Sequence, residues 1–119
     1  TYSTWEEGLL QIFEAVYENK AFIMNAYNSL SREQIENFLF RLTHDLIMGV
    51  VEERSVGTSI TEAQKNFIAD FYKYSFVGIL LDWIHQGMKA DYTSICTDMC
   101  TTLHGNISNS IKNFTNSTE

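Results

Sequence analysis

The chain contains no proline among its 119 residues. Roughly six would be expected at the average usage of about 5%. Proline breaks helices because it lacks an amide hydrogen and because its ring clashes with the preceding turn. A chain without proline can therefore form long helices, and its 45% of hydrophobic residues can give those helices a packed core. The composition predicts a single all-helical domain over residues 1–119.

The charge balance limits the partners that this domain can bind. Eight basic and 15 acidic residues give a formal net charge of −7. Direct binding of nucleic acid or of an anionic membrane surface depends on Lys and Arg, so both are unfavourable here. No segment reaches the roughly 18 consecutive apolar residues of a membrane span. Glu6 and Glu7 replace the basic region of a signal peptide, so we expect a cytoplasmic protein without a membrane partner.

Helix start signals and apolar periodicity predict five helices. In a capping box, a Ser or Thr is followed three residues later by Glu or Gln. Three pairs fit this pattern: Thr4 with Glu7, Ser31 with Gln34, and Thr61 with Gln64. They open the first, third and fourth helices, while a shorter second helix carries Phe22 to Leu30. Residues 55–59 indicate a loop, and Gly87 is expected to end the fourth helix.

The last two predicted helices differ in how their apolar residues are arranged. From Phe76 to Ile84 the fourth helix is apolar on nearly every side, so its own domain or a partner chain must cover it all round. The fifth helix begins near Asp91 and repeats an apolar residue every four positions: Ile95, Met99, Leu103, Ile107 and Ile111. Its remaining positions are mostly weak helix formers, which predicts packing along one narrow stripe.

Catalytic and metal-binding patterns are weak. The chain has no nucleophile motif, no Gly-rich phosphate loop and no spaced carboxylate motif, which predicts a protein that is not an enzyme and needs no cofactor. Cys96, Cys100 and His104 are soft ligands spaced four residues apart. On one straight helix the outer two lie roughly 12 Å apart, too far for a shared zinc ion. A two-ligand pair completed by another chain stays open.

Two segments resemble a known family. Residues 5–19, WEEGLLQIFEAVYEN, precede a short aromatic-rich helix, and residues 71–88, FYKYSFVGILLDWIHQGM, follow a long helix and a loop. This arrangement resembles the C-terminal domain of TetR/AcrR-type transcriptional regulators over roughly residues 5–110. Gly78, Trp83, Ile84, Gly87 and Met88 carry its most specific part, which is similar to the regulators of dihydroxyacetone kinase operons.

The resemblance implies a homodimer in which the last two helices of each copy form a four-helix bundle. Gly78 would allow close helix approach at this interface. We assign to it Gly78, Leu81, Ile84, His85, Ile95, Met99 and Leu103. The resemblance also implies an effector, either a small molecule or a protein co-regulator, that controls DNA binding by an N-terminal helix-turn-helix domain. No basic recognition helix occurs in these 119 residues, so DNA contact is expected only through that further domain.

Aromatic walls with a few orienting hydroxyls are typical of ligand pockets. We therefore predict an effector pocket lined by Phe13, Tyr17, Phe38, Leu42, Phe71 and Tyr74, although each of these aromatics could instead fill the core. Two alternatives to a ligand-sensing domain stay open. One is a helical module that docks a co-regulator and has no small-molecule pocket, and the other is a metal-dependent protein that uses the Cys96 segment.

Overall fold

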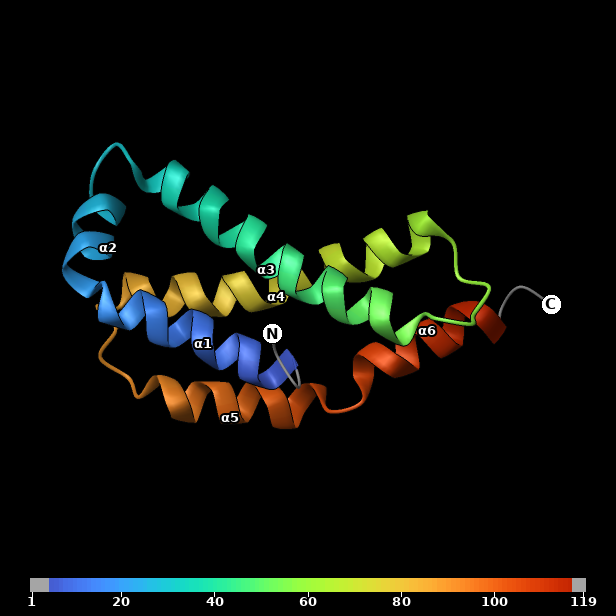
Figure 1. Ribbon diagram of the computed structural model, residues 1–119. Helices are drawn as coiled ribbons and strands as arrows, with labels where there is room; N and C mark the ends of the chain where they lie inside the picture. Colours follow the sequence, from blue (N-terminus) through green and yellow to red (C-terminus); the bar gives the residue numbers. More distant parts are fainter. Residues whose placement is uncertain (1–4, 117–119) are drawn as a thin grey trace.

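The computed structural model describes residues 5–116, which form α-helices and no strand (Figure 1). This confirms the prediction of an all-helical fold. The helices are α1 (Trp5–Glu18), α2 (Lys20–Tyr27), α3 (Arg32–Arg54), α4 (Glu62–His85), α5 (Tyr92–Leu103) and α6 (Asn106–Asn116). None of these helices is long and apolar enough to cross a membrane.

The predicted start of α3 is only partly correct. The helix begins at Arg32, as expected, but the Ser31 side chain makes no capping hydrogen bond. Instead, the Ser31 amide donates to the Ser29 hydroxyl at 3.1 Å, so a turn replaces the predicted capping box. Leu30, expected in the second helix, lies in this turn and is fully exposed. The first predicted capping box needs Thr4, which lies outside the described residues.

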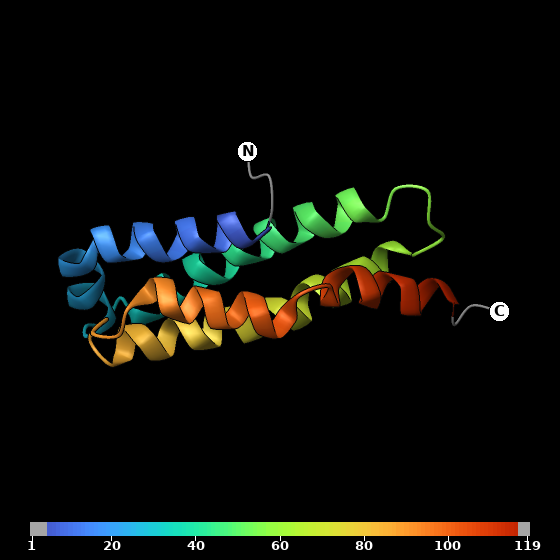
Figure 2. The same cartoon turned by 90° about the horizontal axis from the view of Figure 1, so that it is seen from below.

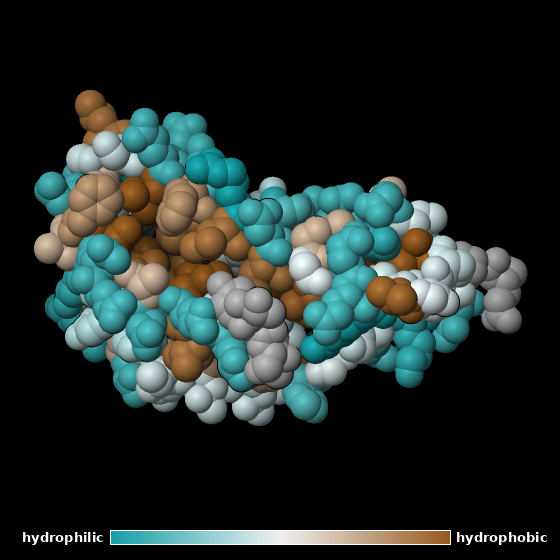
Figure 3. Space-filling model, in the orientation of Figure 1, coloured by the Kyte–Doolittle hydropathy of each residue, from teal (hydrophilic) through white to brown (hydrophobic). Residues whose placement is uncertain are grey.

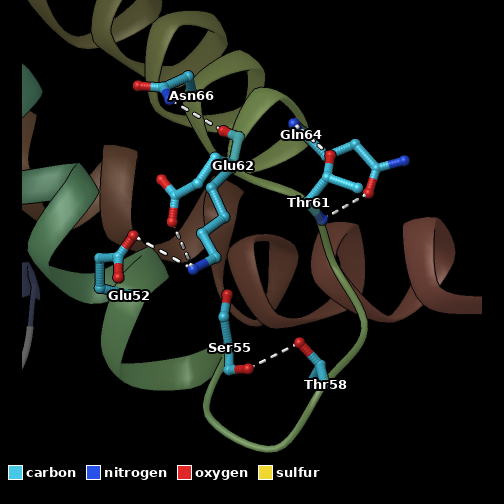
Figure 4. Close-up of polar contacts among 8 residues, drawn as sticks. Glu52, Ser55, Thr58, Thr61, Glu62, Gln64 and Asn66 are labelled. Atoms are coloured by element: carbon cyan, nitrogen blue, oxygen red, sulfur yellow. Dashed lines mark hydrogen bonds and ion pairs between the residues drawn. The ribbon is translucent and has the colours of Figure 1, made fainter.

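The start of α4 follows its sequence signal (Figure 4). The Thr61 hydroxyl accepts from the Gln64 amide at 3.1 Å, and the Gln64 side chain accepts from the Thr61 amide at 3.0 Å. Lys65, one turn into the helix, lies 3.1 Å from Glu62 and 3.4 Å from Glu52 at the end of α3. The Glu62 carboxylate, together with Glu52, raises the pKa of Lys65. These two ion pairs join the end of α3 to the first turn of α4.

Gly87 ends α4, as predicted. The Gly87 amide donates to the Ile84 carbonyl and the Met88 amide to the Trp83 carbonyl, both at 2.9 Å. With Gly87 at φ +85°, these two bonds form a Schellman motif. The Trp83 indole then donates to the Ala90 carbonyl at 2.9 Å, which fixes the turn that leads into α5.

The predicted fifth helix is two helices. Gly105 adopts φ +77° and separates α5 from α6. A four-residue spacing rotates by about 40° at each step, so the stripe from Ile95 to Ile111 would drift by about 160° on one straight helix. The break at Gly105 redirects the chain, and Ile107 and Ile111 are buried on α6, which packs against α3 and α4.

Two sets of helices cover different parts of a long α3–α4 pair (Figures 1 and 2). α1 and α5 lie along one half, whereas α6 lies along the other half. Aromatic contacts join α1 to α4, with ring centroids 5.6 Å apart for Trp5 and Phe76 and 5.2 Å apart for Phe13 and Trp83. The result is an elongated bundle of 51 × 28 × 23 Å.

Candidate functional site

The outer side of α4 is not covered within one copy of the chain. Phe76, Val77, Leu80, Trp83 and Ile84 are all buried against the other helices. Between them, Gly78 and Ile79 are exposed and Leu81 is only half-buried. The protomer thus covers most of this apolar helix but leaves an open strip along its outer side.

A groove with both apolar and polar walls runs between α4 and α5 beside this strip. One cavity of about 430 Å³ is lined by Ser75, Phe76, Ile79, Ile95, Asp98, Met99, Thr102 and Leu103. A second cavity, of about 560 Å³, is lined by Ile79, Asp82, Trp83, His85, Gln86, Lys89, Ala90 and Ile95. Because Ile79 and Ile95 line both, the two cavities adjoin, and together we call them the α4–α5 groove.

The residues assigned to the dimer interface fall into three groups. His85, Ile95, Met99 and Leu103 line the α4–α5 groove. Gly78 and Leu81 lie on the open strip of α4. Ile84 differs from the others because it is completely buried in its own copy, so it serves the intramolecular core.

An exposed aromatic stripe occupies the N-terminal half of α4. Phe67, Phe71 and Tyr74 are each about 60% exposed, and their i, i+4, i+7 spacing places them on one helix face. Phe71 and Tyr74 had been assigned to the effector pocket, but here they point outward. Phe67 and Ile79 were missing from the predicted sites. The sequence does contain a signal for Phe67, because its spacing to Phe71, Tyr74 and Gly78 places all four residues on one helix face.

The residues assigned to the effector pocket differ in how far the described part of the chain buries them. Phe13 is fully buried against Trp83. Tyr17 is half-exposed, and its ring centroid lies 5.4 Å from that of Tyr92 on α5. Phe38 is half-exposed on α3, and Leu42 is partly buried against the core. With Phe71 and Tyr74 on the outer face of α4, these six residues lie in different environments.

A hollow is visible on the side of the molecule opposite to the outer face of α4. Figure 3 shows apolar side chains gathered in a recess over α1 and α3, toward the end closed by α2. In this view α1 lies in front of α4, and Figure 2 also places α1 and α4 on opposite sides. The molecule therefore presents apolar surface on two sides, one at the hollow and one at α4.

A smaller charged cavity of about 310 Å³ lies between α3 and α4. His44 Nδ1 lies 3.5 Å from Asp70 Oδ1, and Lys73 Nζ lies 3.1 Å from the same oxygen. Lys73 also sits 4.8 Å from the centre of the Tyr74 ring. Asp70 thus lies between His44 and Lys73, and His44 Nδ1 is buried without a hydrogen-bond partner among the described residues.

The two cysteines face a groove of about 350 Å³ between α1 and α5. Burial raises the pKa of the Cys96 thiol to about 12 and also raises the pKa of the half-buried Cys100. His104 lies beyond the end of α5. Within residues 5–116, no group of three or more His, Cys, Asp or Glu side chains is placed to hold a metal ion.

The described residues form a small all-helical domain with two open apolar surfaces. A family model described as the transcriptional regulator C-terminal region, TetR_C_8, matches residues 3–105. The chain therefore belongs to the family of TetR-type transcriptional regulator C-terminal regions. No curated protein and no solved structure matches the chain.

Proposed function

We propose that this chain is the effector-sensing and homodimerising domain of a TetR-like regulator that acts in the cytoplasm. In this role it controls DNA binding by a helix-turn-helix domain and makes no DNA contact itself, consistent with its net charge of −7. Within the family, the sequence from Gly78 to Met88 favours the group of dihydroxyacetone-kinase-type regulators.

The observation that carries this proposal is the apolar surface that one copy leaves open along α4 and α5. Isolated apolar side chains on a surface need no explanation, but a contiguous patch marks an interaction site. Here the α4–α5 groove adjoins exposed Ile79 and Gly78 on the same helix. A second copy of the chain would remove both from water and complete the cover that α4 needs.

The hollow over α1 and α3 supports effector binding at a second site. Its apolar walls in Figure 3 are of the kind that surround small ligands, and it lies away from the outer face of α4. α1 is joined to α4 by the contacts of Trp5 with Phe76 and of Phe13 with Trp83. A ligand that binds one arrangement of α1 and α4 more tightly would shift the dimer toward the DNA-binding or the non-binding state.

Light scattering and a thermal-shift screen test the two halves of this proposal. At micromolar concentration the chain should have the mass of two copies, and a monomer would contradict the homodimer. In the screen, small metabolites are added singly, and at least one should raise the melting temperature because it binds only the folded state. A screen without any stabiliser would favour the co-regulator alternative.

A protein co-regulator is the second candidate effector. It is favoured by Phe22 on α2 and Leu30 in the following turn, which are 69% and 104% exposed. α2 and the turn that follows it lie at one end of the bundle, where a docking protein would cover them. The double variant Phe22→Ser, Leu30→Ser should lose such a partner yet keep the homodimer. Equal regulation by this variant in the full-length protein would argue against docking there.

A further inference from the structure

The groove between α1 and α5 is lined by both cysteines of the chain. We propose that Cys96 and Cys100 together bind one Hg²⁺ ion in a linear, two-coordinate geometry. The site lies where α5 faces α1, and it requires neither the homodimer nor the hollow over α1 and α3. It therefore goes beyond the proposed function.

The spacing of the two thiols suits a bridging ion better than a disulfide. Cys96 and Cys100 are free, and they lie on successive turns of one face of α5, with Cβ atoms about 5–6 Å apart. A disulfide needs Cβ atoms about 3.5–4.5 Å apart, so it would distort the helix. Zinc–sulfur bonds are about 2.3 Å long, and a linear bridge with bonds of similar length needs sulfur atoms about 4.6 Å apart. Side-chain rotation can bring the two sulfurs to that separation.

The walls of the groove favour a soft metal ion over a hard one. The Thr97 hydroxyl donates to the Thr93 carbonyl at 2.9 Å, and the Thr101 hydroxyl donates to the Thr97 carbonyl at 2.8 Å. These hydroxyls are thus engaged with the helix backbone. Mg²⁺ and Ca²⁺ need about six or more oxygen ligands, whereas thiolates select soft ions.

The number of ligands limits the choice further. Within residues 5–116, no third His, Cys, Asp or Glu side chain is placed to complete a metal site with the two cysteines. A structural zinc ion takes four ligands in tetrahedral geometry, so this groove does not suit it. A soft ion that is stable with two ligands in a line is the one that the groove fits.

Charge selects among such ions. Both thiols must lose a proton to bind, and burial raises the pKa of Cys96 to about 12. Burial and the Glu6 carboxylate also raise the pKa of Cys100, so the groove disfavours net negative charge. Two thiolates with Cu⁺ would leave one negative charge there, whereas two thiolates with Hg²⁺ form a neutral complex. Binding replaces two S–H bonds by two S–Hg bonds and releases two protons to water, with no change of oxidation state.

The groove also provides a path for the ion. Glu6 and Glu7 line the same groove, and their carboxylates attract a cation toward it. Cys100 is half-buried and Cys96 is buried, so an incoming ion meets Cys100 first. Transfer to the bridging position then needs only the neighbouring turn of α5.

Retention of Hg²⁺ against glutathione, followed by native mass spectrometry at neutral pH, tests the site on the 119-residue chain. The parent chain should hold one ion, and both thiols should then resist iodoacetamide. The matched control is the double variant Cys100→Ser, Lys112→Cys, which keeps two cysteines but moves one to an exposed position on α6. The parent should retain the ion about 100-fold more strongly than this control, because two thiols on one helix face act as a chelate. His104→Ala should retain it as strongly as the parent.

Each other outcome overturns a stated part of the inference. Equal retention by parent and control, two ions on each parent chain, or one ion shared by two chains would overturn the bridged site. A loss of retention in His104→Ala would overturn the two-ligand set. If the parent exceeded the control by more for Cu⁺ than for Hg²⁺, the choice of ion would be wrong. A monomeric parent that holds one Hg²⁺ would support this inference while the proposed homodimer fails.

Discussion

Truncation of Phe13 decides whether this side chain supports the core or lines a ligand pocket. In the structure Phe13 is fully buried, and its ring centroid lies 5.2 Å from that of Trp83. Full burial of such a side chain contributes about 1.5–3 kcal/mol by transfer from water. The Phe13→Ala variant also loses the ring contact and leaves a cavity, so its free energy of unfolding should fall by about 3–5 kcal/mol.

Urea unfolding followed by far-UV circular dichroism measures this loss. Parent and variant must be compared at one protein concentration, because dimerisation would add to the stability of both. Phe22→Ala is the matched control, since its ring is 69% exposed on α2 and its loss should cost no more than about 0.5 kcal/mol. A decrease in the free energy of unfolding of less than about 1 kcal/mol for Phe13→Ala would refute the core assignment and would favour the interpretation that Phe13 lines an open pocket.

Three further perturbations probe the backbone, a helix cap and the cysteines. Gly105→Ala should lower the free energy of unfolding, measured in urea, by about 1–2 kcal/mol because φ at this residue is +77°. Gly49→Ala is the matched control, and it should raise the free energy of unfolding by about 0.5–1 kcal/mol because Gly49 lies in an open helical position. Thr61→Ala should cost about 0.5–2 kcal/mol, and no measurable loss would contradict the capping box. Because burial raises the pKa of Cys96 to about 12 from its usual 9.0, the unfolded chain ionises first, and the free energy of unfolding should fall as pH rises from 9 toward 12. The free energy of unfolding should fall less steeply with pH in Cys96→Ala. At neutral pH, iodoacetamide should modify Cys100 faster than Cys96, because Cys96 is buried and Cys100 is only half-buried. Faster modification of Cys96 would contradict this difference in burial.

Local signals predicted helix ends well where a side chain or a glycine could act without long-range contacts. The Thr61 and Gln64 pair caps α4, and Gly87 ends it. Asp91 likewise caps α5, with its carboxylate accepting from the Thr93 amide at 3.1 Å. The Ser31 pair failed because a nearby serine offers the backbone a competing hydrogen bond. Propensity at a helix start is thus reliable only when no neighbour competes for the same amide.

Residues whose environment depends on distant helices were harder to predict. Phe13, Phe71 and Phe76 have the same side chain and all lie on helices, yet only Phe71 is exposed. Periodicity assigns a residue to a face but does not say which face a neighbouring helix will cover. The split between α5 and α6 differs, because it had a local signal in Gly105, whose φ of +77° separates the two helices.

The placement of the two tryptophans has a spectroscopic consequence. The chain has only Trp5 and Trp83, and both lie in the contact between α1 and α4, against Phe76 and Phe13. Their fluorescence should therefore respond when α1 separates from α4. Detachment of α6 from the other half of the bundle would leave both indoles in place and would not change the emission. Intrinsic fluorescence of this protein thus reports on the half of the bundle that links the hollow to α4.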